Sequence, residues 1–341
     1  MNTAIRFQRI IVSLAAALIF AGCAASPKKV LVVSVTTGFR HSSIGVAEKT
    51  LARLGQESGA FTVVDYARQP DVRVPQKPNA PQKPKELAAD ASDTAKAKHK
   101  EDMAKFETAQ KKYESDLEKW NASQNEVKAA QSNYDKSLKE SLGKLSPENL
   151  KNFDAVIFAN TTGNLPLPDK QGFIDWIKNG GAFIAMHSGS DTLHFRDQPG
   201  FFQPYIDMLG GEFETHGAQV SVDAINKDKT HPATKHLGNT FTVFDEIYII
   251  KSYDPKSVHE LLVLDKHPNS KQPGHYPVAW CKRLGKGKVF YTSLGHREDV
   301  WDPEWKERKN AKDVAEAYNK HILGGIKWAL GLEKGDATPG N

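Results

Sequence analysis

The sequence comprises 341 residues with a formal net charge of +5 and two cysteines. The small net charge, without a Lys/Arg cluster interleaved with aromatic residues, argues against a nucleic-acid-binding protein. The length allows one large α/β domain with an added segment, or two small domains.

The N-terminus resembles a bacterial lipoprotein signal. Two arginines precede the apolar stretch Ile10–Ala21, which is short for a membrane span, and small residues lead to Cys23. We expect residues 1–22 to be removed as a signal peptide and Cys23 to carry a lipid. This lipid would anchor the protein to the outer membrane, facing the periplasm, whereas an ordinary secretory signal is the alternative. Cys281 would then be the remaining cysteine, which excludes an intramolecular disulfide.

The first structural unit follows directly. Val30–Val35 and Phe61–Asp65 are predicted strands, and the segment between them has helical spacing through Leu51 and Leu54. A β-α-β start of this kind predicts a parallel sheet.

Residues 70–145 interrupt this pattern. Five prolines between positions 70 and 84 predict an extended spacer, and residues 85–145 predict helix because they contain no proline and one glycine. Apolar residues on two seven-residue registers, three positions apart, are typical of a coiled coil. We expect a helical hairpin that folds near Asn121–Asn125, or a long helix that pairs with a partner or a second copy. A solvated helix or a partly disordered insertion is the third interpretation.

The α/β pattern resumes at Ser146, so residues 28–69 and 146–333 form one interrupted domain, followed by a disordered tail at 334–341. Helices are expected at Asp169–Asn179, Phe201–Leu209 and Asp313–Leu330. Strands are expected at Ala155–Ala159, Ala182–Met186, Val220–Ala224, Phe241–Ile250, Leu261–Leu264, Val278–Leu284 and Lys288–Ser293.

Four apolar strands each end in a polar turn that contains glycine. If these strands are parallel neighbours, their turns lie along one edge of the sheet, where open α/β sheets place their sites. His41, His187 and His296 lie in three of these turns, so we expect them to converge. Imidazole titrates near neutral pH and can transfer protons there.

Other residues could complete such a site. Asp245 and Glu246 are adjacent, and side chains of neighbouring strand residues point to opposite faces, so one would act while the other anchors the backbone. Ser188 is a candidate nucleophile, although its surroundings lack the G-x-S-x-G pattern. For a metal site, His187, His194, His216, His231 and His236 were considered. They lack a tight metal-binding spacing, so a divalent metal stays an open alternative with unknown ligands.

Several short motifs occur in a characteristic order. They are Thr37–His41, Gly181–Ser188, Gly210-Gly211 with Phe213 and His216, His231-Pro232, Asp245-Glu246-x-Tyr248, Pro277–Trp280, Gly285–His296 and Trp328-Ala329. In this order they resemble the ThuA-like (trehalose-utilisation) family of the class I glutamine-amidotransferase-like superfamily.

The resemblance implies a flavodoxin-like α/β fold, a parallel sheet with helices on both faces, to which the coiled-coil helical segment is added. It also implies a role in the use of trehalose or related sugars. His187-Ser188 occupies the turn where glutaminase members carry a cysteine, so glutaminase chemistry is not implied. The segment 70–145 is a departure from the compact domain of the family.

The leading hypothesis is a periplasm-facing lipoprotein that binds or acts on a sugar or keto-sugar. Its catalytic candidates are His41, His187, His296, Glu246 and Asp245. Its ligand-binding candidates are Thr37, Gly38, Arg40, Asn160, Thr161, Ser188 and Tyr248. The alternatives are a non-catalytic carbohydrate-binding or scaffolding lipoprotein and a metal-dependent hydrolase. Whether the protein is an enzyme, such as a hydrolase or lyase, stays open.

Overall fold

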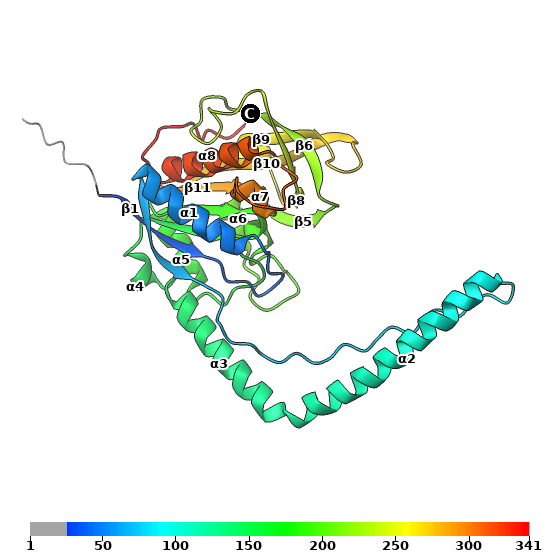
Figure 1. Ribbon diagram of the computed structural model, residues 1–341. Coiled ribbons are helices and arrows are strands. Elements are labelled where there is room, and N and C mark those ends of the chain that lie inside the picture. Colours follow the sequence, from blue (N-terminus) through cyan, green and yellow to red (C-terminus); the bar gives the residue numbers. More distant parts are fainter. Residues whose placement is uncertain (1–25, 341) are drawn as a thin grey trace, which may run out of the picture.

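A nine-stranded sheet in the order β2-β1-β3-β4-β11-β10-β9-β6-β7 forms the centre of the computed structural model, which describes residues 26–340 (Figure 1). The predicted signal peptide and Cys23 lie outside the described residues. Within residues 26–340, no helix is long and apolar enough to cross a membrane.

Five adjacent strands of this sheet are parallel. They are β1 (Lys28–Val33), β2 (Phe61–Ala67), β3 (Ala155–Ala159), β4 (Ala182–Met186) and β11 (Gly287–Thr292). Every residue of β3 and β4 is buried, as expected for parallel strands with helices on both faces. The predicted parallel sheet is therefore confirmed for this half of the domain.

The other four strands are antiparallel and extend the sheet beyond β11. They are β10 (Pro273–Leu284), β9 (His259–Lys266), β6 (Val220–Asn226) and β7 (Thr240–Asp245). A separate two-stranded sheet pairs β5 (Glu212–His216) with β8 (Tyr248–Lys251). The single strand predicted for Phe241–Ile250 is thus two strands in different sheets, because the chain turns at Glu246 and Ile247.

Helices cover both faces of the sheet. Alternate residues of β1 point to opposite sides, with Val30 and Val32 in one apolar core and Leu31 and Val33 in the other. The first core is closed by α1 (Ile44–Ser58), α7 (Glu298–Trp301) and α8 (Lys312–Ala329). The second is closed by α4 (Pro147–Leu150), α5 (Lys170–Lys178) and α6 (Gln203–Leu209). Short 3₁₀ helices lie at η1 (His187–Asp191) and η2 (Pro255–Ser257). This arrangement confirms the flavodoxin-like α/β class.

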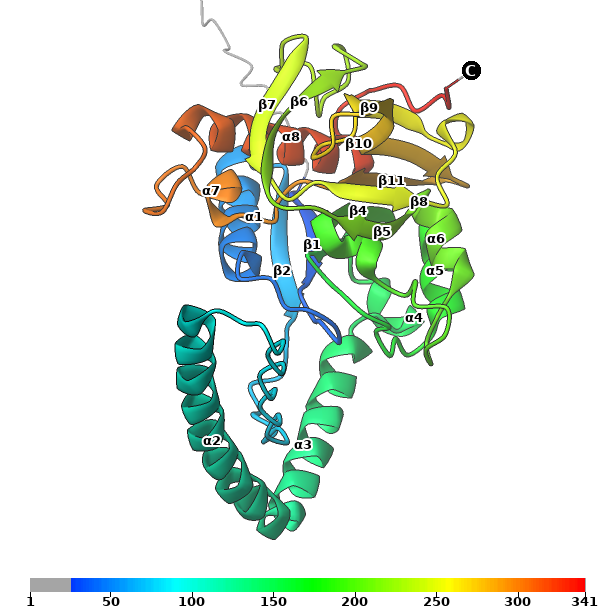
Figure 2. The ribbon, with the colours of Figure 1, turned by 90° about the vertical axis from the view of Figure 1, so that its right-hand side faces the viewer.

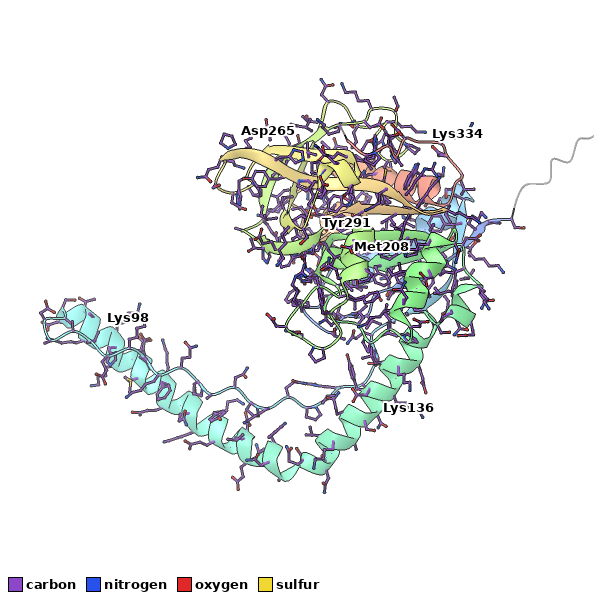
Figure 3. The ribbon with its side chains drawn as sticks, turned by 180° about the vertical axis from the view of Figure 1, so that it is seen from behind. Lys98, Lys136, Met208, Asp265, Tyr291 and Lys334 are labelled. Atoms are coloured by element: carbon purple, nitrogen blue, oxygen red, sulfur yellow. The ribbon has the colours of Figure 1, made fainter. Side chains whose placement is uncertain are left out.

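The segment 70–145 forms a helical arm that projects from the domain. It contains α2 (Asp93–Ala122) and α3 (Gln124–Gly143), which meet at Ser123 and diverge from there as the two sides of a V (Figures 1 and 2). Figure 3 shows Lys98 near the far end of the arm and Lys136 on the side nearer the domain. The chain breaks where a hairpin turn is predicted, but the helices do not pack as a hairpin. The physical reason is that polar residues interrupt the apolar stripe of α2. This helix therefore has too little apolar surface to pack against α3, and it buries no residue.

The end of α3 belongs to the second core. Leu138, Leu142 and Leu145 are 6%, 0% and 0% exposed, and Lys144 pairs with Asp65 on β2 at 2.6 Å. The packed domain therefore extends into α3, beyond the predicted boundary at residue 146.

The C-terminal segment is also held against the domain. Trp328 donates its indole N–H to the carbonyl of Gly335 at 3.2 Å, and the backbone N–H of Gly340 bonds to the carbonyl of Val258 at 3.0 Å. Ala337 is buried. Residues 334–340 are thus ordered rather than disordered, because their backbone groups find partners on the domain.

Candidate functional site

Three histidines meet at one edge of the parallel sheet. β1, β3, β4 and β11 are neighbours, so the turns after them lie together, and His41, His187 and His296 follow β1, β4 and β11. His187 Nε2 lies 3.2 Å from His41 Nε2 and 3.3 Å from His296 Nδ1. The structure therefore brings together the three side chains that the strand ends predict.

The backbone at the end of β4 turns sharply. His187 has a φ of 43°, in the left-handed region that residues with a side chain rarely adopt. This conformation carries the chain directly from β4 into η1. Strain of this kind persists where the surrounding structure enforces it, and it is common at functional sites.

Hydrogen bonds orient two of the imidazole rings. His187 Nδ1 lies 2.8 Å from the carbonyl of Ser293, which only accepts, so this nitrogen carries the hydrogen and Nε2 faces the other histidines with its lone pair. His41 Nδ1 lies 3.3 Å from the hydroxyl of Ser188, which leaves His41 Nε2 directed at the cluster.

A carboxylate completes this group. Glu246 Oε1 lies 3.2 Å from His296 Nδ1 and 3.8 Å from His187 Nε2, and Glu246 Oε2 lies 3.1 Å from His216 Nδ1. His41, His187, His296 and Glu246 thus form a His/Glu cluster, whose potential ligand atoms all lie within 4.8 Å of one another.

Asp245 has a different role. Its carboxylate accepts hydrogen bonds from the backbone N–H groups of Gly295, Glu246 and Arg297 at 2.7, 3.0 and 3.2 Å. These bonds connect the start of the β7–β8 turn to the loop that carries His296. Glu246 thus faces the cluster while Asp245 anchors the backbone, in line with the predicted division between the two.

Burial sets the charge state of the cluster. It lowers the pKa of His41 to about 4, with a contribution from the nearby His296 ring, and it lowers the pKa of His187 well below its usual value. For His296, burial opposes protonation, but the hydrogen bond and charge of Glu246 outweigh it and raise the pKa. Burial raises the pKa of Asp245 to about 6, although its three hydrogen bonds from backbone N–H groups act in the opposite direction. At neutral pH, His41 and His187 are therefore neutral rings with free lone pairs.

A cavity of about 350 Å³ opens above the cluster. It is lined by Phe39, His41, Asp191, Phe213, His216, Glu246, Tyr248 and His296. Phe39 is 69% exposed and contacts the His41 ring edge-on at a centroid distance of 4.9 Å. Tyr248 packs on His187 and on Phe213 at centroid distances of 4.2 and 4.3 Å. The site thus has a polar floor and aromatic walls.

Four predicted ligand-binding residues bond within the protein. The Arg40 guanidinium donates to the carbonyl of Ser34 at 2.8 Å, and the Asn160 amide donates to Ser43 Oγ and to the carbonyl of Gly295 at 3.0 and 2.9 Å. Thr161 and Thr192 share a hydroxyl hydrogen bond at 2.9 Å. Ser188 is fully buried beneath His41, where its hydroxyl lies 3.3 Å from His41 Nδ1 and orients the ring.

Thr37 and Gly38 lie in the exposed loop after β1. The backbone N–H of Thr37 bonds to the carbonyl of Thr162 at 2.9 Å, and Thr162 Oγ1 donates to the carbonyl of Phe39 at 2.7 Å. These contacts hold the loop, and with it Phe39, at the cavity mouth.

The sequence motifs that carry the family resemblance include Phe39, Phe213 and His216, and His216 was also weighed as a metal ligand, but none of the three was selected as a site residue. The available signal for Phe39 was its position in a strand-end turn, but exposure of an aromatic ring is a tertiary property. Phe213 and His216 lie on β5, whose pairing with β8 places them beside the cavity.

Histidines elsewhere form separate groups. His194 pairs with Asp191 at 2.7 Å and lies 3.3 Å from Glu212. His236 bonds to the carbonyl of Ala317, and His231 lies beside the buried Cys281. Of the histidines considered from spacing for a metal, only His187 is in the His/Glu cluster.

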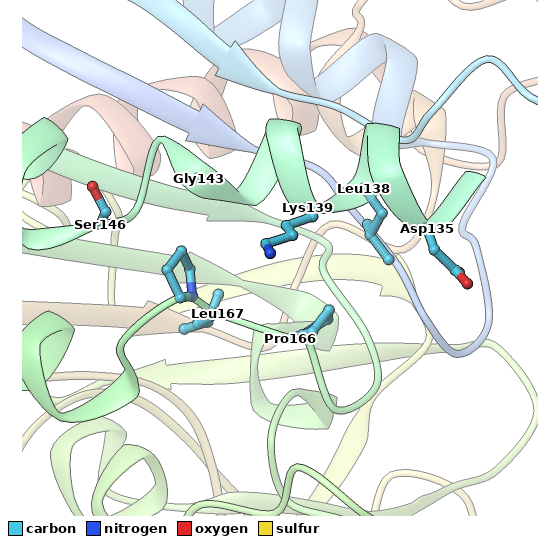
Figure 4. Close-up of a pocket in the computed structure, with 8 residues that line it drawn as sticks. Asp135, Leu138, Lys139, Gly143, Ser146, Pro166 and Leu167 are labelled. Atoms are coloured by element: carbon cyan, nitrogen blue, oxygen red, sulfur yellow. The ribbon is translucent and has the colours of Figure 1, made fainter. Parts of the chain in front are cut away.

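A second and larger cavity, of about 590 Å³, lies between the base of α3 and the loop at 166–168 (Figure 4). Leu138, Pro166 and Leu167 give it a largely apolar lining. Because it holds no cluster of histidine and carboxylate groups, it is a less suitable reaction site than the sheet edge.

The fold and the candidate site together define a class of protein: a flavodoxin-like α/β domain with a group of histidines and a carboxylate at the ends of its parallel strands. The family model for ThuA, trehalose utilisation, matches residues 91–329, and the chain belongs to this family. The Thr37–His41 motif precedes the matched region, which contains the other motifs and all of α2 and α3.

Solved structures show the same fold. A ThuA-like protein from Bacteroides uniformis superposes with a TM-score of 0.52 at 16% identity, over 91% of this chain and 94% of that one. A ThuA-like protein from Parabacteroides merdae gives 0.50 at 13% identity, over 91% and 92%. Because the family model itself starts at residue 91, the two helices of the arm belong to the matched region, and the expectation that they depart from the family is wrong. No curated protein sequence matches the chain.

Proposed function

We propose that this protein binds a sugar or keto-sugar in the cavity above the His/Glu cluster and acts on it there. The observation that carries the proposal is the exposed ring of Phe39 at the mouth of a cavity whose polar lining consists of His41, His216, His296, Asp191 and Glu246. Aromatic faces pack against the C–H groups of a pyranose ring, while imidazole and carboxylate groups bond its hydroxyl or carbonyl oxygens. Membership in the trehalose-utilisation family supports this class of ligand.

The site has the parts needed for proton transfer. His216 is partly exposed beside Glu246, and His296 shares a hydrogen bond with the same carboxylate. A proton taken from a bound hydroxyl could therefore pass to Glu246 and the histidines that contact it, His216 and His296. We propose further that a lipid on Cys23 holds the protein at the outer membrane, facing the periplasm, and that the arm serves a partner or a second copy.

Binding can be tested by calorimetry and thermal unfolding with trehalose, related disaccharides and their keto derivatives. A ligand that binds the folded state raises the melting temperature. Phe39→Ala is expected to weaken binding about 3- to 10-fold, through loss of one aromatic contact. Val64→Ala removes another exposed apolar side chain, on β2, and should leave binding unchanged.

Two results would contradict the proposal: no response to any of these sugars, or equal affinities for wild type and Phe39→Ala. A second function, binding without reaction, is favoured because Ser188, the candidate nucleophile, is fully buried with its hydroxyl against His41. Chromatography of sugars after incubation separates the two, because an enzyme converts the bound ligand and a binding protein returns it unchanged.

A further inference from the structure

We propose that His41, His187, His296 and Glu246 bind one divalent first-row transition metal ion, with Zn²⁺ as the best fit. The metal centre lies in the cavity described above and would be the reactive part of that site. This inference rests on the proposed function only where it concerns the sugar ligand. Metal binding is measured in the absence of sugar, so the two proposals can fail separately.

The spacing of the ligand atoms fits such an ion. A tetrahedral zinc ion with bonds of about 2.0–2.2 Å holds its ligand atoms about 3.3–3.6 Å apart. In the cluster, His187 Nε2 lies 3.2 Å from His41 Nε2 and 3.3 Å from His296 Nδ1, and Glu246 Oε1 lies 3.2 Å from His296 Nδ1 and 3.8 Å from His187 Nε2. The remaining pairs lie within 4.8 Å, which leaves space for an ion among all four atoms.

Hydrogen bonds among the four groups explain this arrangement less well than a bound metal ion does. His187 has one lone pair in the ring plane at Nε2, because its Nδ1 donates to the carbonyl of Ser293. Two other ring nitrogens and a carboxylate oxygen approach this lone pair, yet it can accept one proton. A single cation among the four atoms would serve all of them together.

The surrounding groups provide the support that metal ligands require. The carbonyl of Ser293 holds the His187 ring through its other nitrogen, and the Ser188 hydroxyl does the same for His41. Partners of this kind fix the tautomer and orientation of ligating histidines. Asp245 holds Gly295 and Arg297, the neighbours of His296 in the chain.

The donor set decides the class of metal. Three imidazole nitrogens and one carboxylate oxygen suit Zn²⁺, Co²⁺ or Ni²⁺, whereas Mg²⁺ and Ca²⁺ prefer oxygen ligands. Phe39 and Tyr248 flank the cavity above the cluster, so a sugar oxygen could approach from that side. A bound ion would there polarise a carbonyl or hydroxyl oxygen of the ligand.

The test starts from purified protein freed of metal with a chelator and dialysed against Zn²⁺, Co²⁺, Mg²⁺ or Ca²⁺. Elemental analysis should find one equivalent of Zn²⁺ or Co²⁺ per chain and no stoichiometric Mg²⁺ or Ca²⁺. The visible spectrum of the Co²⁺ form should show the ligand-field bands of a bound, low-coordinate ion. His187→Ala and Glu246→Gln should each bind at least tenfold more weakly.

His275→Ala is the matched control, since His275 pairs with Glu260 at 2.5 Å in a histidine–carboxylate contact outside the cluster. It should keep one equivalent of metal. If His187→Ala does not fold, Glu246→Gln decides, because its side chain is replaced by one of the same shape. The inference is overturned if folded wild type binds neither Zn²⁺ nor Co²⁺ in stoichiometric amount, or if Glu246→Gln binds as tightly as wild type. Metal binding without any sugar response would uphold the inference and contradict the proposed function.

Discussion

The root of the helical arm is predicted to stabilise the whole α/β domain. Leu142 near the end of α3 is fully buried in the second core, together with Leu138 and Leu145. Replacing a buried leucine with alanine removes its transfer free energy and leaves a cavity, at a cost of about 2–5 kcal/mol. Leu142→Ala should therefore lower the free energy of unfolding by about that amount, a large share of the 5–15 kcal/mol typical of a domain.

Urea unfolding followed by tryptophan fluorescence and circular dichroism measures this difference. Leu117→Ala is the control, because Leu117 lies on α2, which buries no residue, and it should cost less than about 1 kcal/mol. Equal stabilities for the two variants would refute the claim that α3 completes the core. Deletions give a second test: removal of 70–145 takes away all three leucines and should prevent stable folding, whereas removal of 85–125 retains them.

Two further predictions concern the domain away from α3. Gly295→Ala should lower the free energy of unfolding by about 1–3 kcal/mol, because the φ of Gly295 is +113° and the new Cβ would lie 2.6 Å from the Tyr318 hydroxyl. Gly238→Ala is the control in the same urea assay. Its new Cβ would meet nothing within 4 Å, so it should be nearly neutral. Burial opposes ionisation of Asp228, but hydrogen bonds from Thr230, His259 and backbone N–H groups lower its pKa to about 2. This carboxylate therefore stabilises the fold above about pH 4 and loses its contribution as the pH falls toward 2, so Asp228→Asn should cost about 1–2 kcal/mol at pH 7 and progressively less below pH 4. If the difference in unfolding free energy between wild type and Asp228→Asn did not become smaller below pH 4, this assignment would be wrong.

Much of the site could be predicted from local pattern. The runs that form β3 and β4 are too uniformly apolar for a sheet with one face in water, and each ends abruptly in a polar turn. Parallel neighbours bring such turns together irrespective of loop length. For this reason the sequence alone predicts that His41, His187 and His296 lie at one edge of the sheet.

The arm and the tail were less predictable. Heptad spacing in 85–145 indicates a helix that could pair, but pairing requires enough apolar surface to bury, and α2 buries none within this chain. The polar composition of 334–340 indicates disorder, yet backbone hydrogen bonds to the domain hold it in place. Both outcomes depend on surfaces that are distant in sequence.

The sequence by itself determined the α/β class, the polar turn that follows each parallel strand, and the residue types in those turns. These features follow from periodicities of a few residues. Only the tertiary structure decided which atoms meet. Glu246 rather than Asp245 faces the histidines because the chain turns between β7 and β8. His187 presents Nε2 because its Nδ1 bonds to Ser293, which is 106 residues away in sequence. Contacts between such distant residues set the chemistry of the site, and no local pattern encodes them.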